Sequence, residues 1–178
     1  MNISIRKFTA DDIPNKVEWI NNPHNNKYLH YDIPLEINKT KVWFENIKES
    51  SSRYDGVIVA DNRPVGLIGL LSIDNKVKKA EYYICLNHED TGKGIAGTAT
   101  HKLLNYAFEE LKLNKVYLFT EENNIPAQRL FGKIGFVTEG ILRDDVINNG
   151  KFVNRYVMSI LRTEYEGKQN DGNTKACL

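Results

Sequence analysis

The sequence predicts a mixed α/β fold, and two patterns lead to this prediction. The β-rich runs Tyr54 to Ala60 and Val65 to Ile73 are joined by the turn residues Asp61-Asn-Arg-Pro, which is typical of an antiparallel hairpin. Farther along, a strand, a glycine-containing loop, a long periodic segment from Ile95 to Leu111 and the strand Lys115 to Thr120 favour a parallel crossover. With 41% hydrophobic residues, 178 residues can build one core without disulfides or structural metal.

The first half of the chain alternates strands and helices. Asn2 to Phe8 alternates apolar and polar residues as a strand does, and Thr9-Ala-Asp-Asp then offers a helix N-cap. The helix that follows is expected to end before Pro23, and a polar loop is expected from His24 to Glu36. The next elements are a helix from Thr40 to about Ser50 and a strand from Lys79 to Leu86.

The second half adds the helix Pro126 to Ile134 and the strands Phe136 to Leu142 and Phe152 to Leu161. No internal repeat or linker is visible, so residues 1–166 are expected to form a single domain. The polar tail 167–178 is expected to be disordered.

Charge and composition restrict the functional classes. The formal net charge is +1, from 24 basic and 23 acidic residues, so nucleic acid is not an expected partner. Cys85 and Cys177 are too few and too far apart for a disulfide framework. The N-terminal residues contain no apolar stretch of the length that a signal peptide or membrane anchor needs. A cytoplasmic enzyme without membrane attachment is expected.

The stretch Asp90-Thr-Gly-Lys-Gly-Ile-Ala-Gly-Thr lies between an apolar strand and a helix. Gly92 and Gly94 allow the backbone to turn tightly close to a ligand, and the first N–H groups of the helix have no partner within it. Such a positive helix end attracts phosphate. The stretch is not a Walker loop, because Gly94 and not Ser or Thr follows Lys93. Gly92, Gly94 and Gly97 satisfy the dinucleotide pattern only formally, because the βαβ context is missing.

The same stretch resembles the GNAT superfamily signature Gln/Arg-x-x-Gly-x-Gly/Ala, which it matches at Gly94 and Ala96. The first position departs from the signature, because Thr91 stands in place of Gln or Arg. The resemblance continues in Ile3-Ser-Ile-Arg, Trp19-Ile-Asn-Asn-Pro, Ala80-Glu-Tyr-Tyr-Ile, Asn124-Ile-Pro-Ala-Gln-Arg-Leu-Phe-Gly-Lys-Ile-Gly-Phe and Glu139-Gly. It is strongest to the branch of ribosomal-protein N-terminal, spermidine and nucleotide-linked amino-sugar acetyltransferases.

The resemblance implies a twisted, mostly antiparallel mixed sheet flanked by helices. It also implies an acetyl-CoA-dependent N-acetyltransferase in which the pantetheine arm lies between the strands Lys79–Leu86 and Lys115–Thr120 and the acetyl group is transferred directly to a primary amine. The residues expected to bind acetyl-CoA are Leu86, Thr91, Gly92, Lys93, Gly94, Ile95, Ala96, Gly97, Asn124 and Phe131. Lys133 is a further lysine near the phosphates, and Asn124 is also expected to cap its helix.

Glu81 is predicted to be the general base, acting directly or through water, with a substrate-binding carboxylate as the alternative. Many family members carry a tyrosine at the position of Phe131 as general acid. Because phenylalanine has no proton to donate, the thiolate is expected to be protonated by solvent, with Tyr83 or Ser72 as alternatives; a thiol of pKa about 8.5 is a good leaving group in any case.

Other candidate sites are weaker. Cys85 precedes His88 and Glu89, but neighbouring strand residues point to opposite faces, so a buried inert thiol is the preferred interpretation. The four histidines show no metal-ligand spacing, and no metal is expected. Trp19, Trp43 and Phe44 are predicted to belong to the core.

The loop residues Tyr28, His30 and Tyr31 are predicted to contact the acceptor, which we expect to be a small or nucleotide-linked amine. A protein N-terminus, an acyl-CoA-binding module without catalysis and a nucleotide-binding protein are the alternatives. The family resemblance also implies that the chain can form a homodimer through the last strands.

Overall fold

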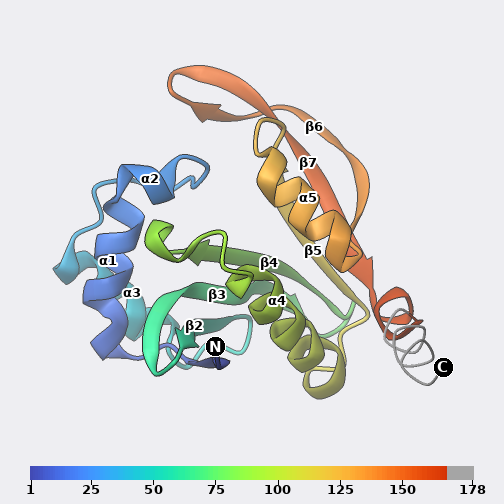
Figure 1. Ribbon diagram of the computed structural model, residues 1–178, viewed down its shortest axis with the longest axis horizontal. Coiled ribbons are helices and arrows are strands. Elements are labelled where there is room, and N and C mark those ends of the chain that lie inside the picture. The colour runs from blue at the N-terminus through green and yellow to red at the C-terminus, as the bar shows by residue number, and fades with distance from the viewer. Residues whose placement is uncertain (168–178) are drawn as a thin grey trace. The chain divides into compact units, whose positions relative to one another are not determined.

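In the computed structural model, which describes residues 1–167, a mixed seven-stranded sheet is flanked by helices (Figure 1). The strands are β1 (Ile3–Lys7), β2 (Tyr54–Ala60), β3 (Arg63–Asp74), β4 (Lys79–Leu86), β5 (Lys115–Glu121), β6 (Val137–Asn148) and β7 (Lys151–Leu161), in the order β1-β2-β3-β4-β5-β7-β6. The α-helices are α1 (Ile13–Asn21), α2 (Pro23–Asn26), α3 (Ile37–Ile47), α4 (Ile95–Asn105) and α5 (Ile125–Ile134). The shorter segments are the 3₁₀ turns η1 (Ala10–Asp12) and η2 (His88–Asp90) and the π-helical segment η3 (Tyr106–Glu110).

The strand pairing confirms both patterns that predicted the fold class. β2 and β3 form an antiparallel hairpin whose two loop residues, Asp61 and Asn62, have φ of 47° and 66°. Positive φ at both positions is the type I′ turn that matches the twist of paired strands. β4 and β5 pair in parallel from Lys79↔Lys115 to Glu81↔Tyr117, whereas the β1–β2, β5–β7 and β6–β7 pairs are antiparallel.

The chain forms two compact units. The first comprises Met1–Ile73 with Tyr82–Leu104, and the second comprises Asp74–Glu81 with the residues from Asn105 onward. Strand β4 contributes to both, because its first three residues belong to the second unit and the remainder to the first. The expected single domain over residues 1–166 stays a prediction.

Helices cover both faces of the sheet in the first unit. Tyr82 on β4 is buried and its hydroxyl lies 2.7 Å from the Oγ1 of Thr100 on α4. Cys85, an odd number of residues farther on, belongs to a buried cluster with Trp19 and Ile20 of α1. Since side chains alternate along a strand, α4 and α1 pack on opposite faces of β4.

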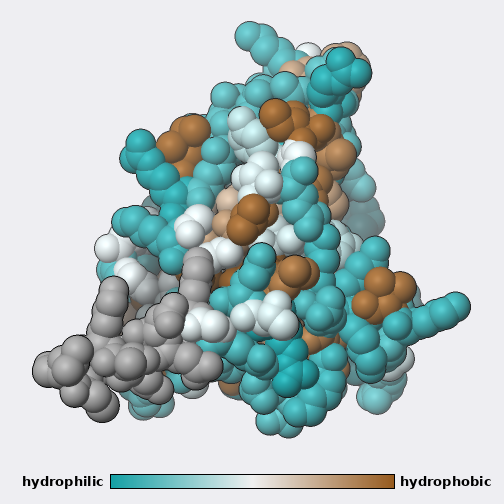
Figure 2. Space-filling model, turned by 90° about the vertical axis from the view of Figure 1, so that its right-hand side faces the viewer, coloured by the Kyte–Doolittle hydropathy of each residue, from teal (hydrophilic) through white to brown (hydrophobic). Residues whose placement is uncertain are grey.

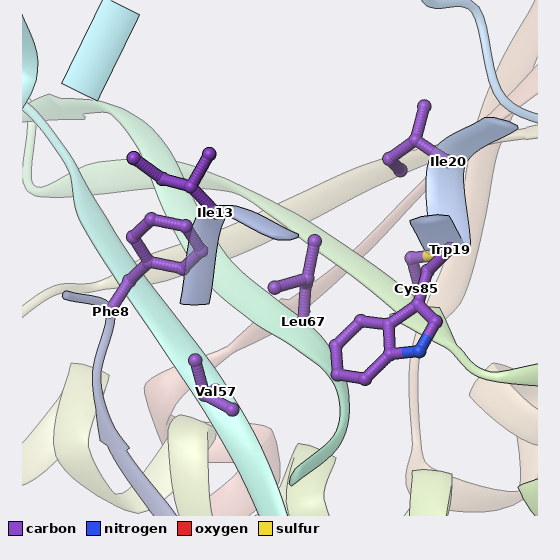
Figure 3. Close-up of a cluster of buried hydrophobic side chains, with 7 residues drawn as sticks. All are labelled: Phe8, Ile13, Trp19, Ile20, Val57, Leu67 and Cys85. Atoms are coloured by element: carbon purple, nitrogen blue, oxygen red, sulfur yellow. The ribbon is translucent and has the colours of Figure 1, made fainter. Parts of the chain in front are cut away.

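The cluster around α1 is the apolar core that positions this helix (Figure 3). Its buried members come from the start of the chain, from α1 and from three strands: Phe8, Ile13, Trp19, Ile20, Val57, Leu67 and Cys85. Trp43 and Phe44 of α3 pack against it, with ring centroids 5.9 Å and 5.7 Å from that of Phe8. Trp19 is therefore a core residue, as predicted, and Trp43 and Phe44 are partly buried against that core.

In the second unit, α5 lies along β5 and β7 (Figure 1). The amide of Gln128 donates to the carbonyl oxygens of Glu121 and Glu122, each at 3.0 Å, and so ties α5 to the end of β5. Phe131 packs edge-on against Phe136 with a centroid distance of 5.5 Å. Residues 162–167 are helical, and Tyr165 donates to Asn105 at 3.0 Å. Apart from Gly167, which is helical here, the tail expected to be disordered lies outside the described residues.

Several helix boundaries differ from the prediction. The expected loop from His24 begins with the short helix α2, because Pro23 occupies a first-turn position where its missing N–H is not needed and Asn22 caps the helix by accepting from the N–H of His24. α3 begins three residues earlier than Thr40, which instead donates back to the Glu36 carbonyl. The predicted helix Ile95–Leu111 changes to π-helical spacing after Asn105, with the N–H of Leu111 donating to Tyr106.

β6 is longer than the predicted Phe136–Leu142 because its charged residues continue the strand as an irregular ladder. The register shifts between Leu142 and Val146, where Asp144 has φ of 50°. There the N–H of Asp144 donates to the side chain of Asn154, and Asp145 pairs with Arg155 at 2.5 Å. In the sequence these charged residues are typical of a loop, but in the structure residues of β7 pair with them.

Apolar side chains are also exposed on the β6–β7 hairpin. Val137, Ile141, Ile147 and Phe152 each expose more than half of their surface. On the face that Figure 2 presents, apolar side chains form separate brown patches among hydrophilic ones. The expected homodimer through the last strands stays a prediction.

Replacing Gly69 by alanine tests the packing of β3 in the first unit. A Cβ there would lie 2.3 Å from the carbonyl oxygen of Tyr54 and 2.5 Å from the Tyr83 ring. We expect Gly69→Ala to lower the free energy of unfolding in urea by about 2 kcal/mol or more, because neither neighbour is a flexible chain end. Gly140→Ala is the control, since its Cβ meets nothing within 4 Å. Equal stability of the two variants would contradict this packing.

Candidate functional site

The loop between β4 and α4 has the backbone that its glycines predict. Gly92 and Gly94 have φ of 75° and 78°, a conformation that residues with a Cβ rarely adopt. A Cβ built on either residue meets nothing within 4 Å, so the space beside the loop is open. The glycines thus provide both the turn and room for a ligand close to the backbone.

The N–H groups of this loop are available to a ligand. Within the described part of the chain, no acceptor binds the backbone N–H groups from Gly92 to Gly97, and the first bond of α4 runs from Thr98 to the Gly94 carbonyl at 3.3 Å. The side chain of Ile95 is fully buried and fixes the start of the helix. A fixed row of free donors at a helix N-terminus is an anion site.

A buried carboxylate anchors this loop. Asp90 is 1% exposed and accepts two hydrogen bonds from Arg63, at 2.7 and 3.0 Å, and one from Lys93 at 2.9 Å. The Arg63 guanidinium holds the pKa of Asp90 below its usual range. Two cations against one carboxylate leave a positive charge beside the open N–H groups. Arg63 lies 27 residues before Asp90, and nothing in the sequence pairs them.

Two other predicted cofactor residues of this loop have local structural roles. The hydroxyl of Thr91 donates to the His88 carbonyl at 2.7 Å and closes the turn before the glycines. The carbonyl of Ala96 accepts from the hydroxyl of Thr100. Leu86 ends β4, where its backbone and side chain lie beside Gly66.

In the second unit, Glu81 is half-buried on β4. Burial raises the pKa of its carboxyl, and the charge of Arg155 on β7 opposes this effect. Among residues 1–167, no group donates a hydrogen bond to the carboxylate of Glu81, whose backbone pairs in the sheet. The register pairs Glu81 with Tyr117 of β5, whose phenol pKa is raised by burial and by the Glu81 charge. A carboxylate with a raised pKa and no fixed proton donor has the properties of a general base.

Asn124 and Phe131, the predicted cofactor residues of the second unit, both stabilise α5. The Asn124 side chain accepts from the N–H of Ala127 at 3.3 Å, which confirms the predicted cap. Phe131 is only 5% exposed and belongs to the core. Their contacts with a cofactor stay predictions.

The three predicted acceptor residues lie on the segment between α2 and α3. Tyr28 has the Lys27 ammonium 5.0 Å from its ring centroid, and His30 is exposed. Tyr31 is 39% exposed and its ring centroid lies 5.3 Å from the Nζ of Lys16. Tyr31 is thus connected to a charged cluster of the first unit.

That cluster was not predicted from the sequence. Lys16 of α1 is 5% exposed, and its Nζ lies 4.4 Å from the ring centroid of Trp43. Asp55 of β2 accepts from Arg53, at 2.6 and 2.8 Å, and from the Tyr83 hydroxyl at 2.7 Å. Burial lowers the pKa of Lys16 to about 8, against the opposing charge of Asp55.

Cys85 is the buried thiol that the sequence predicts. Burial raises its pKa to about 11, which leaves it protonated. His88 does not serve as its base, because its Nδ1 lies 3.3 Å from the Asn22 amide and its ring stacks on His24 with a centroid distance of 5.1 Å.

No three His, Cys, Asp or Glu side chains within residues 1–167 gather as a metal site requires. None of the helices in this part of the chain has the length and apolar character to cross a membrane.

The fold and the open N–H row define the GNAT class of acetyltransferases. Residues 2–137 match the model of the acetyltransferase (GNAT) domain family. The chain belongs to this family and is a GNAT N-acetyltransferase.

Similar proteins span two thirds of the chain or more. The spermidine N(1)-acetyltransferase of Vibrio cholerae is 30% identical over 168 residues, which cover 92% of this chain and 95% of the relative. The putative ribosomal N-acetyltransferase YdaF of Bacillus subtilis is 36% identical over 121 residues, 68% of this chain and 63% of the relative. The crystal structure of the V. cholerae spermidine N-acetyltransferase with CoA and spermine aligns with a TM-score of 0.88 at 27% identity, covering 92% and 98% of the two chains.

Replacing Lys16 by methionine tests the burial of its charge. Below pH 8 the folded and unfolded chains both carry the proton, so the folded state bears the full penalty, roughly 3 kcal/mol for a pKa lowered from 10.5 to about 8. We expect Lys16→Met to raise the free energy of unfolding at pH 7 by up to this amount, offset by the lost contact with Trp43. This gain in stability shrinks between pH 8 and 10.5, because there Lys16 loses its proton in the folded wild type but keeps it in the unfolded chain.

Chemical unfolding at pH 7 and pH 10 measures both effects, with the exposed Lys41→Met as control. A Lys16→Met variant that is less stable at pH 7, or a difference independent of pH, contradicts a buried and penalised charge.

Proposed function

We propose that this protein transfers the acetyl group of acetyl-CoA directly to the primary amine of a small molecule. The row of unpaired N–H groups from Gly92 to Gly97 carries this proposal, because a CoA pyrophosphate is an anion of the kind such a row binds. The relative solved with CoA and spermine supports both the cosubstrate and a small amine acceptor.

The residues of the loop fit this cosubstrate. The positive φ and open surroundings of Gly92 and Gly94 allow phosphate oxygens to approach the backbone, and Arg63 and Lys93 outnumber the Asp90 carboxylate. Leu86, Thr91, Ile95, Ala96 and Gly97 of the first unit are proposed as further cosubstrate residues, and so are Asn124 and Phe131 of the second unit. Of these, Thr91, Ile95, Asn124 and Phe131 hold the local structure around them.

In the proposed reaction, the amine nitrogen forms a bond to the acetyl carbon while the bond from that carbon to sulfur breaks. The protonated amine must lose one proton before attack and a second afterwards. Glu81 accepts a proton, directly or through water, and the thiolate leaves with the sulfur electron pair. Tyr83 is a poor general acid, since its hydroxyl proton is held by Asp55 and burial raises its pKa well above 10. Solvent is therefore preferred over Tyr83 as the source of the thiol proton, and Ser72 stays the alternative.

A protein N-terminus is the second candidate acceptor. The relative YdaF, named a putative ribosomal N-acetyltransferase, supports this alternative. A small molecule is preferred because the two spermidine-specific comparisons span more than nine tenths of this chain, whereas YdaF matches about two thirds of it.

Gly94→Ala tests the anion cradle. The substitution strains a residue at φ of 78° and places a methyl group in the open space beside the N–H row. We expect calorimetry to show CoA binding at least ~10-fold weaker, about 1.4 kcal/mol, because the methyl group occupies space that the phosphate oxygens need. The strain at this φ also favours loop conformations in which the N–H row is no longer aligned.

Gly150→Ala is the matched control, because Gly150 has φ of 73° and equally open surroundings in the β6–β7 turn. If wild type fails to bind CoA or acetyl-CoA, the proposed function is wrong. If both variants lose affinity equally, strain and not the cradle is responsible.

Glu81→Gln tests the general base. We expect kcat to fall by about 10²-fold or more at pH 7, because an amide accepts no proton. The wild-type rate should fall as the pH drops through the carboxyl pKa, which burial raises above 4.5, and this acidic limb should be absent from the variant.

Steady-state release of CoA thiol between pH 5 and pH 9 provides the measurement, with the exposed Glu110→Gln as control. An unchanged pH profile in Glu81→Gln would show that another group accepts the proton.

A further inference from the structure

Lys16 occupies a position in α1 where an apolar residue is expected. Ile13, Lys16 and Ile20 are spaced as one helix face, and all three are buried. The two isoleucines belong to the apolar core in Figure 3. An ammonium on this face is costly for the folded chain, so its presence requires a reason other than packing.

The ammonium of Lys16 has no oxygen partner within the described residues. Its Nζ faces two aromatic rings, Trp43 at 4.4 Å and Tyr31 at 5.3 Å from the centroids. Cation–π contacts attract the charge, but they leave its three N–H donors without acceptors. A polar side chain that is nineteen-twentieths buried and lacks an acceptor indicates a missing ligand.

The nearby carboxylate is already neutralised. Both oxygens of Asp55 accept from Arg53, and one also accepts from Tyr83. Arg53 also lies over Trp43, with its Cζ 5.2 Å from the ring centroid. The charges of Arg53 and Asp55 cancel, so the charge of Lys16 is the surplus of this buried cluster.

We propose that Lys16 binds an anionic group, a carboxylate or a phosphate, that the acceptor carries in addition to its amine. This inference rests on the proposed function and specifies its substrate class. Tyr31 is partly exposed, its ring faces the Lys16 ammonium, and it is one of the residues predicted to contact the acceptor. The hydroxyl of Tyr83 donates to Asp55 and so holds the neighbouring charge pair of the first unit in place.

A plain polyamine does not match this cluster. It carries only positive charges, and Lys16 and Arg53 both repel it, with Asp55 already committed to Arg53. An amine with a carboxylate or phosphate instead supplies the acceptor oxygens that Lys16 lacks. The proposed acceptor therefore differs in charge from the spermine bound in the solved relative.

Matched acceptor pairs test the proposal with the full-length chain and acetyl-CoA. Ornithine against putrescine isolates a carboxylate, and glucosamine 6-phosphate against glucosamine isolates a phosphate. We expect wild type to favour the anionic member of one pair at least ~10-fold in kcat/KM, a difference of about 1.4 kcal/mol. Lys16→Met should abolish this preference through KM, with kcat retained, whereas the exposed Lys41→Met should keep it.

Calorimetric titration of the same four amines into the CoA-loaded protein provides a readout without turnover. If wild type binds the anionic member of a pair and Lys16→Met does not, the result supports the proposal. If no amine is acetylated at all, the proposed function is refuted, but the binding result still stands. If wild type prefers neither ornithine over putrescine nor glucosamine 6-phosphate over glucosamine, or if its preference is unchanged in Lys16→Met, the proposal is overturned.

Discussion

Backbone N–H groups at the first turn of a helix have no partner inside the helix, and the candidate site depends on this constraint. Strand β4 leads directly into the loop, and two glycines with positive φ turn the chain so that α4 begins with its donors free. The buried Ile95 and the hydrogen bonds of Asp90 with Arg63 and Lys93 fix the residues on either side of the two glycines.

Buried charges repeat one arrangement in the first unit, with a single exception. Asp12, Asp55 and Asp90 are each less than 8% exposed, and each accepts a two-pronged set of hydrogen bonds from an arginine. Bidentate pairing offsets the desolvation of both charges. Lys16 is buried to the same degree but faces only aromatic rings. The contrast between three neutralised carboxylates and one unneutralised ammonium makes Lys16 the unusual residue of this unit.

The accuracy of the sequence analysis depended on how local the determining interactions are. The β2–β3 hairpin, the loop glycines and the Asn124 cap follow from neighbouring residues, and the structure has all three. The length of β6 was missed, because Asp144 and Asp145 are accommodated only by residues of β7. Arg63 and Lys16 were missed for the same reason, since the first pairs across 27 residues and the second is buried by helices and loops distant in sequence.

The sequence by itself determined the fold class, the family and the glycine loop with its free helix end, because periodicity, turn residues and helix ends act over a few residues. The tertiary structure decided which charges are buried and which of them have partners. Desolvation and ion pairing depend on groups brought together from separate elements, as Asp55 with Arg53 and Tyr83 or Lys16 with Trp43 demonstrate. The buried charge of Lys16, from which the anionic acceptor is inferred, therefore exists only in the folded chain.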